Sequence, residues 1–339
     1  MLYSSRFLEI DIPDSFWKIQ KLPSATRAIT SIYLVLSIFL LFIRYQSYSQ
    51  LDEVTRGNTS FAEITFPILQ MVPDKMKYYP FSIVLSNFID TELWKFIINL
   101  LNLSIGGAYI ERNWGSSREI FKFTILLGTI TNVVVVLFTF AMSFIFDGIS
   151  LSKPIDGNYT ILIGFPIIYK QLLPETTIFE IKNIPLISKN FRFKLLPIFV
   201  ICVVTLVQLI WLHHFAQLIS IWLSFVSCWV YLRFYQTLSL AGDNSNAEVA
   251  FAGDTSDTFQ FIYLFPDVVK PLLRPIFDLI YDIVCVKLRL IRPLELSDIE
   301  KGNSIAEQRG AKPLEGSATS KDEERRRQKA LEVLQERMS

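Results

Sequence analysis

Cysteine, histidine and net charge are all scarce in this chain. Its 339 residues include three cysteines and two histidines, and the formal net charge at pH 7 is +1. Three cysteines without paired spacing (Cys202, Cys228 and Cys285) argue against a disulfide framework and against a zinc site. A net charge near zero leaves no broad basic surface for nucleic acid. We therefore expect no metal, no other cofactor and no nucleic-acid partner.

The N-terminal region lacks the features of a cleavable signal peptide. Asp11, Asp14, Lys18 and Lys21 precede the first apolar run, and no small-residue cleavage site follows that run. We therefore expect residues 1–27 to form a cytosolic N-terminus and the first apolar run to remain as a membrane anchor.

What the chain has in quantity is apolar sequence, since hydrophobic residues make up 51% of it. Five runs approach or exceed the roughly 20 residues with which a helix crosses a bilayer, and a sixth, shorter run suits a helix surrounded by its neighbours. The long runs are 28–44, 93–110, 120–146, 195–212 and 215–234, and the short one is 160–173. Because lipid offers the backbone no hydrogen bonds, such runs must be helices. The sequence predicts an all-α membrane protein whose membrane domain covers 28–236.

The number of spans depends on a turn at His213 and His214. Residues 195–235 would make one helix about 60 Å long, twice the thickness of the bilayer core. A turn at the two histidines gives six spans, and a five-span reading stays open. In the six-span threading, basic residues flank the N-terminus, follow the second and fourth spans, and include Arg233 at the end of the sixth. That distribution predicts cytosolic termini.

In this threading the loop 45–90 is lumenal. Its alternating apolar and polar residues predict amphipathic structure at the membrane surface rather than an added span. Asn58 begins an Asn-Thr-Ser sequon in this loop and is the candidate glycosylation site.

Polar residues inside the predicted spans are few. Gly106 and Gly107, with polar neighbours, are typical of close helix packing. His213 and His214 could form a metal or proton site, but a hairpin at the membrane interface accounts for them more simply. No charged residue falls at the midplane of a predicted span, so the sequence does not favour an ion-coupled transporter.

Polar sequence follows the last span, and residues 237–292 are expected to hold a strand and a helix on the cytosolic side. Alternation over 258–265 predicts a short strand that Pro266 ends. Apolar residues at helical spacing over 267–291, interrupted by charges, predict an amphipathic helix on the membrane face or against the bundle.

The C-terminal part is polar. Residues 293–320 have no apolar periodicity, which predicts a disordered linker. Residues 321–339 follow a capping-box pattern and carry charge pairs at helical spacing, which predicts a final charged helix.

Six spans, a long amphipathic first loop and the stretch Glu111-Arg-Asn-Trp114-Gly115 just after the second span resemble the rhomboid fold. The resemblance implies a six-helix membrane bundle with a cytosolic C-terminal tail.

The nucleophile of rhomboid proteases lies in a Gly-x-Ser-Gly stretch at the start of the fourth span, and the histidine base lies in the sixth. The matching stretch here is Gly157-Asn158-Tyr159-Thr160, in which tyrosine replaces the serine and threonine the second glycine. The base position falls near Ser220, with His214 as an alternative register. Because a serine nucleophile needs its base, the resemblance implies a protein without protease activity.

Three further motifs, in order along the chain, are similar to those of the eukaryotic transmembrane protein 115 family. They are Trp229-Val-Tyr231-Leu-Arg233-Phe234-Tyr235-Gln236, then Gly253-Asp254-Thr-Ser-Asp257-Thr-Phe259-Gln-Phe261 with Phe265-Pro266-Asp267, then Glu324-Arg-Arg-Arg-Gln-Lys-Ala-Leu331. The resemblance covers most of the chain and is loose over 147–200. It implies a rhomboid-like pseudoprotease of the Golgi.

The function implied by this resemblance is retrograde transport from the Golgi to the endoplasmic reticulum, with effects on glycosylation. Its implied partners are the lipid bilayer and the conserved oligomeric Golgi tethering complex, and its implied location is a Golgi membrane with cycling through the endoplasmic reticulum. A homo-oligomer is left open. Two alternatives also stay open: a derlin-like factor in membrane-protein quality control, and a divergent intramembrane hydrolase using Thr160 or Ser220 with His213 or His214.

The same motifs also have interpretations from the residues themselves. The aromatic residues of the 229–235 segment, with Arg233, predict an aromatic and basic belt at the cytosolic interface. Gly253, Asp254 and Asp257 predict a turn before the expected strand.

Overall fold

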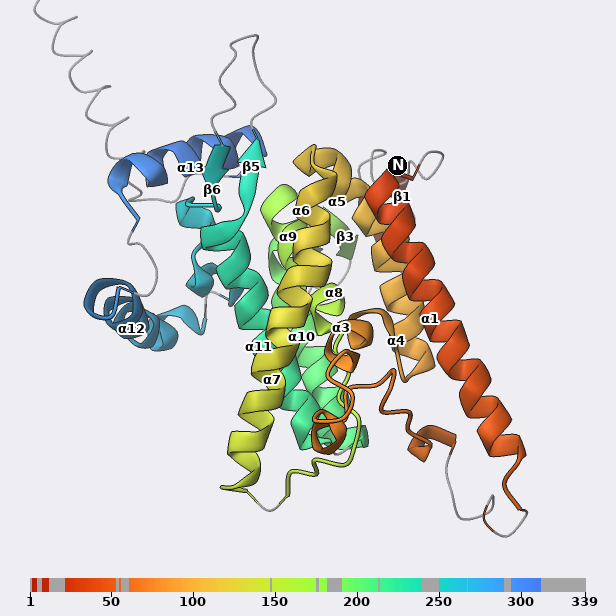
Figure 1. The fold of residues 1–339 in the computed structure, drawn as a ribbon. Coiled ribbons are helices and arrows are strands. Elements are labelled where there is room, and N and C mark those ends of the chain that lie inside the picture. Colours follow the sequence, from red (N-terminus) through yellow and green to blue (C-terminus); the bar gives the residue numbers. More distant parts are fainter. Residues whose placement is uncertain are drawn as a thin grey trace, which may run out of the picture.

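The computed structural model describes residues 2–4, 8–11, 22–52, 55, 61–146, 148–174, 177–181, 191–212, 214–239, 250–266, 268–289 and 294–311. Long helices form a bundle (Figure 1). One end of it carries α13 (Leu296–Gln308) and the hairpin of β5 (Thr237–Ser239) and β6 (Ala250–Ala252). The C-terminal ends of α1 (Ser24–Ser49) and α7 (Gly128–Ser143) lie at the other.

Five helices are long and apolar enough to cross a membrane. They are built from α1 (Ser24–Ser49), α4 and α5 (Leu93–Leu101, Gly107–Trp114), α6 and α7 (Ser117–Phe121, Gly128–Ser143), α10 (Leu196–Leu206) and α11 (Phe215–Val230). Single π-helical turns join or extend them at Asn102–Gly106, Lys122–Leu127, Val207–Leu212 and Tyr231–Tyr235. Their outward faces expose large apolar side chains such as Val35, Leu137 and Ile210. Apolar surface of this extent indicates contact with lipid, which confirms the prediction of a helical membrane protein.

The short apolar run forms a helix inside the bundle, as predicted. It consists of α8 (Tyr159–Leu162) and α9 (Gly164–Leu172), and every residue of both is buried. Gly164 allows this packing, because a Cβ there would lie 2.7 Å from the Phe123 ring and 2.8 Å from Cys228 Sγ. The predicted sixth pass therefore corresponds to a helix surrounded by protein rather than by lipid.

Gly106 serves close packing in the same way. A Cβ at this position would lie 1.7 Å from the hydroxyl of Tyr169 in α9. The second span can approach α9 only with glycine there, in agreement with the predicted small-residue interface.

The segment after α1 contains short helices and, in its described part, no further span. They are η2 (Phe61–Glu63), η3 (Pro73–Lys75), α3 (Ser82–Leu85) and η4 (Ser86–Phe88). The expectation of structure lying at the membrane surface is wrong for its second half, because Met71 and Asn87 are fully buried. Asn132 in α7 donates hydrogen bonds to Ile83 O (3.0 Å) and Asn87 Oδ1 (3.0 Å), which attach this half to the bundle. Asn58 lies outside the described residues.

Short strands accompany the helices and were not expected from the sequence. Strands β1 (Leu2–Ser4), β2 (Leu8–Asp11), β3 (Thr177–Ile181) and β4 (Phe191–Arg192) form an antiparallel sheet in that order, with Leu2 opposite Asp11 and Leu8 opposite Ile181. Strands β5 (Thr237–Ser239) and β6 (Ala250–Ala252) form a hairpin, with Thr237 opposite Ala252. The fold as a whole stays predominantly helical.

The strand expected at 258–265 is wrong. The segment forms two 3₁₀ turns, η10 (Asp257–Phe259) and η11 (Phe261–Leu264). Tertiary contacts override the local alternation: Trp229 Nε1 donates to Phe259 O (3.0 Å), and the Phe261 ring lies 4.8 Å from the Trp229 ring. The predicted turn at Gly253 is present, with φ +78° and a Cβ position 2.1 Å from Arg233 O that only glycine can leave empty.

The amphipathic helix predicted over 267–291 is present as α12 (Lys270–Tyr281), continued by a π-helical turn (Asp282–Lys287). Phe277 packs against the rings of Phe261 and Phe265. No residue of α12 is buried, so most of this helix faces away from the protein.

The prediction of a disordered linker over 293–320 is wrong in its first half. Residues Leu296–Gln308 form helix α13. Asn303 Nδ2 donates to Asp257 Oδ2 (2.9 Å), and Arg309 pairs with Asp254 (3.4 Å). Polar and small side chains make these contacts, so apolar periodicity gave no signal. Residues 312–320 and the charged helix predicted over 321–339 lie outside the described residues.

Candidate functional site

A buried ion pair lies at the start of the second span. Lys95, in the first turn of α4, is fully buried and pairs with Asp156, which precedes α8. Thr91 Oγ1 donates to Asp156 Oδ1 (2.8 Å), and Gln217 Nε2 of α11 donates to Asp156 Oδ2 (3.2 Å). Glu92 lies 3.5 Å from Lys95 Nζ. One carboxylate thereby connects the second span, the buried helix and α11.

A second polar network surrounds Asp90. Its carboxylate accepts hydrogen bonds from Tyr33 of α1, from Asn99 Nδ2 (3.1 Å) and from Asn158 Nδ2 (2.5 Å). Burial raises the pKa of the Asp90 carboxyl above its usual range. The segment that enters α8 thus supplies one buried acidic group, Asp156, and is bonded to a second, Asp90, through Asn158.

The three degenerate catalytic positions are fully buried beside these networks. The Tyr159 hydroxyl accepts from Gln208 Nε2 (3.2 Å) and contacts Lys95 Nζ (3.5 Å). Ser220 Oγ donates to the backbone carbonyl of Asp156 (3.2 Å). The hydroxyl of Thr160 has no hydrogen-bond partner among the described residues. The structure thus brings the predicted positions together on α8 and α11.

The histidine that could act as a base has another contact. His214 Nδ1 accepts from the backbone N–H of Gln217 (3.3 Å), so that its side chain caps the start of α11. Burial lowers the pKa of His214, which favours the neutral imidazole near pH 7. In the described part of the chain, no serine or threonine hydroxyl forms a hydrogen bond with this ring. His213 lies outside the described residues.

The end of α5, which contains Glu111 and Trp114 and is followed by Gly115, contacts the start of α1 and the third span. The Glu111 carboxylate accepts from the backbone N–H (2.8 Å) and hydroxyl (2.7 Å) of Thr26, at the start of α1. A carboxylate at a helix N-terminus satisfies unpaired N–H groups and favours the helix dipole. Trp114 is buried with its ring 6.1 Å from that of Phe123, and Gly115 ends the helix at φ +64°.

The 229–235 segment contacts protein more than the predicted interfacial belt implies. Arg233 is buried and donates to the carbonyls of Asp254 (2.7 Å) and Ser256 (2.5 Å). Tyr231 donates to Glu119 (3.0 Å). The indole N–H of Trp229 donates to Phe259 O, as described above, and the Phe234 ring packs edge-on against the Trp229 ring. Tyr235, by contrast, is 57% exposed. The two matching motifs, 229–236 and 253–267, therefore contact each other through Trp229 and Arg233, whereas Pro266 in the second motif is exposed.

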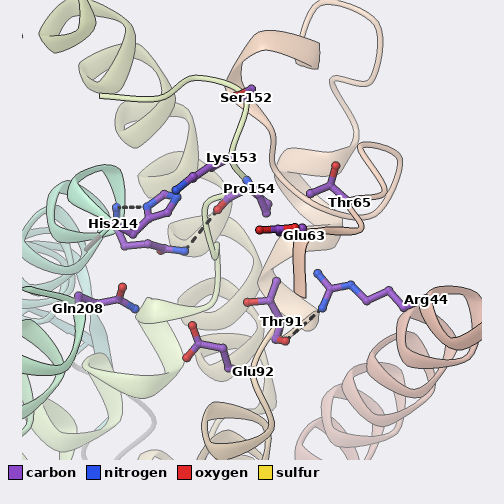
Figure 2. Close-up of a pocket in the computed structure, with 11 residues that line it drawn as sticks. Arg44, Glu63, Thr65, Thr91, Glu92, Ser152, Lys153, Pro154, Gln208 and His214 are labelled. Atoms are coloured by element: carbon purple, nitrogen blue, oxygen red, sulfur yellow. Dashed lines mark hydrogen bonds between the residues drawn. The ribbon is translucent and has the colours of Figure 1, made fainter. Parts of the chain in front are cut away.

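A cavity of about 310 Å³ adjoins the polar networks (Figure 2). Arg44, Thr91, Glu92, Lys153, Gln208 and His214 are among its lining residues. They come from α1, the segment before α4, the segment before α8, the π-helical turn that extends α10 (Gln208) and the residue before α11 (His214).

Sequence reasoning missed Asp90, Lys95 and Asp156. Each lies at the end of an apolar run, where a charge is ordinary, and Lys95 and Asp156 are 61 residues apart. The one available signal was Lys95, a lysine within the second predicted span, because a charge there requires a partner.

The chain has relatives among known proteins. Residues 27–339 match the family described as eukaryotic integral membrane protein (DUF1751). The chain is 55% identical to the Transmembrane protein 115 homolog of Saccharomyces cerevisiae, over 100% of this chain and 99% of the relative. It is 24% identical to Rhomboid-like protein 19 of Arabidopsis thaliana (82% and 83% covered) and 24% identical to Transmembrane protein 115 of Homo sapiens (77% and 68% covered). No solved structure matches the chain.

The buried ion pair should respond to mutation as a unit. Lys95→Met leaves Asp156 buried and uncompensated, and should lower the free energy of unfolding by about 3–5 kcal/mol. Adding Asp156→Asn removes the second charge and should restore part of that loss. Thermal unfolding in mild detergent, followed by tryptophan fluorescence, measures both.

The control is Lys75→Met, which removes an ion pair with Asp74 at 3.2 Å whose side chains are 52% and 54% exposed. It should cost less than about 1 kcal/mol. A double variant less stable than Lys95→Met would contradict this account of the pair.

Proposed function

Because the chain belongs to the transmembrane protein 115 family of eukaryotic integral membrane proteins, we propose that it acts without catalysis in retrograde transport from the Golgi to the endoplasmic reticulum, with effects on glycosylation. The observation that carries the non-catalytic part is the burial of Tyr159, Thr160 and Ser220. Tyr159 and Ser220 make contacts that hold α8 against its neighbours, and no hydroxyl–histidine pair supports a nucleophile among the described residues.

The proposed topology has six spans, cytosolic termini and a lumenal loop 45–90. It is supported by the structure in one respect: α13 and the β5–β6 hairpin lie at one end of the bundle, and the ends of α1 and α7 lie at the other (Figure 1). The cavity would then face the lumenal side, and the end carrying α13 would face the cytosol, where a tethering complex could bind it.

A glycan mapping experiment tests this topology. Asn58 should carry an N-linked glycan that endoglycosidase removes and that Asn58→Gln abolishes, because oligosaccharide transfer takes place in the lumen. A sequon engineered into residues 321–339 should stay unmodified. The reverse pattern would invert the threading.

The proposed location and chemistry have their own test. The full-length tagged protein should overlap a Golgi marker at steady state, and the purified protein should not react with a fluorophosphonate probe, with an active serine hydrolase as the positive control. Residence in the endoplasmic reticulum alone would favour the derlin-like alternative. Labelling that Thr160→Ala removes would establish the hydrolase alternative instead.

Helix α12 is the second element of the proposal. Leu272 is 72% exposed and Ile276 is 49% exposed, although both are large and apolar. Arg274, Asp278 and Asp282 interrupt the apolar stripe, so the helix cannot span a bilayer and is suited to the boundary of headgroups and acyl chains. We infer that it anchors the tail to the cytosolic leaflet.

Removing the apolar side chains of α12 should therefore weaken this anchor. In the variant Leu272→Ser, Leu273→Ser and Ile276→Ser, each substitution should weaken membrane binding by up to about 1.5–3 kcal/mol, the free energy gained when lipid covers a large apolar side chain. We expect reduced Golgi retention and reduced recovery of cytosolic partners, while the thermal unfolding of the bundle is unchanged. The matched control, Asp278→Ser with Asp282→Ser, changes the polar positions of the same helix and should behave like wild type. Equal behaviour of the two variants would refute the anchor.

A further inference from the structure

The residues that line the cavity in Figure 2 bear mostly polar groups. Pro154 is the one apolar residue of the lining within the described part of the chain, and the others carry hydroxyl, amide, imidazole or charged groups. Ligand sites are usually lined mainly by aliphatic and aromatic side chains. An acyl chain or an apolar peptide side chain would therefore find little to pack against here.

The charges of the described residues in and directly behind the cavity wall balance one another. Three carboxylates are matched by three cations, namely Glu63, Glu92 and Asp156 against Arg44, Lys95 and Lys153. A ligand with a net charge of either sign would add a charge without a counter-ion, which is unfavourable where water is excluded. The cavity therefore favours a neutral ligand.

Four buried polar atoms of the lining have no hydrogen-bond partner in the described part of the chain. Two are donors: Arg44 Nη2, and Nε2 of His214, which carries the proton of the neutral ring because Nδ1 accepts from Gln217 N–H. Two are acceptors, Glu92 Oε2 and Gln208 Oε1. Figure 2 shows Arg44 across the cavity from Gln208 and His214, so donors and acceptors come from different walls. Buried groups of this kind require partners from a ligand or from water.

We propose that this cavity binds a neutral ring with several hydroxyl groups, that is, a single sugar unit. A hydroxyl can both donate and accept a hydrogen bond, so hydroxyls spread around one ring can meet the donors Arg44 and His214 and the acceptors Glu92 and Gln208. A volume of about 310 Å³ lies at the lower end of the usual range for ligand sites, which suits one ring rather than an extended chain. This inference does not depend on the proposed Golgi role.

Saturation-transfer NMR on the purified full-length protein tests the proposal. The protein is held in phosphatidylcholine nanodiscs, because glycoside detergents would compete for the site, and empty nanodiscs give the background. The probes are glucose, galactose, mannose and N-acetylglucosamine, with N-acetylalaninamide as a neutral peptide mimic. At least one sugar should bind saturably. Failure of all four sugars to bind, whether or not the peptide mimic binds, would overturn the proposal.

Charged and substituted relatives of the sugar that binds test the ligand class and its source. The uronate and the amino sugar of the same ring should bind at least about fivefold more weakly, because each brings an uncompensated charge. Equal or tighter binding of either would contradict a site for a neutral ligand. The methyl glycoside has a blocked anomeric position, as the terminal residue of a glycan does. If it binds as well as the free sugar, the site accepts a glycan terminus, and if it does not, the ligand is a free monosaccharide.

A matched pair of glutamine variants locates the binding. Gln208 and Gln171 are both buried, each donates through Nε2 to one described partner, and each has an Oε1 without a partner among the described residues. Of the two, only Gln208 lines the cavity. Gln208→Leu should weaken sugar binding about tenfold through loss of an acceptor, whereas Gln171→Leu should leave it unchanged. If the two variants bind the sugar alike, the binding is elsewhere and the proposal fails.

A second pair at the rim avoids changes to the protein interior. Ser150 and Ser152 are both exposed, and their hydroxyls lie 3.0 Å apart, but only Ser152 lines the cavity. Ser152→Trp should abolish sugar binding by filling the cavity, and Ser150→Trp should retain it. Binding to Ser152→Trp at the wild-type level would place the sugar outside this cavity and refute the proposal.

Discussion

The contact between Lys95 and Asp156 is the interaction on which the polar end of the bundle depends. Asp156 also accepts from Gln217 through its side chain and from Ser220 through its backbone carbonyl, so that α4, α8 and α11 meet at one residue. A buried ion pair contributes little net stability, but its members tolerate no other arrangement without leaving a charge unpaired. We infer that its main effect is to specify how the buried helix enters the bundle.

The degenerate catalytic positions follow from that constraint. Tyr159 comes three residues after Asp156, and its hydroxyl lies between Lys95 and Gln208. A serine there could not reach both, because its side chain is shorter by a phenyl ring. The residue that replaces the nucleophile thus extends the polar network, and the position has become part of the scaffold.

Much of the membrane domain could be predicted from the sequence, because its cause is local. Apolar length alone identifies the long helices, and the shorter run at 160–173 suits a helix surrounded by its neighbours, as α8 and α9 are. The candidate site could not be predicted in the same way. Asp90 and Asp156 lie in connecting segments, where carboxylates are common, and only the folded chain shows that water is excluded from them. Patterns of hydrophobicity report burial of apolar faces and carry no information on polar pairs.

The tail shows the same limit. Helix α12 has an apolar stripe and was predicted, whereas α13 binds through Gly302 and Asn303 and was not. A Cβ at Gly302 would lie 2.3 Å from Thr255 Oγ1, so the contact depends on the lack of a side chain. Deleting 293–320 would therefore remove a docked helix, contrary to the expectation from composition.

Helix α11 and its final π-helical turn connect these two parts of the molecule. Gln217 and Ser220 near its start are bonded to Asp156, and Trp229 and Arg233 near its end are bonded to the segment that binds α13. Hydrogen bonds of about 3 Å weaken steeply when their atoms move apart. A shift of α11 along its axis would therefore break contacts at both ends together. The polar networks and the docked tail are therefore held by contacts at the two ends of the same helical segment.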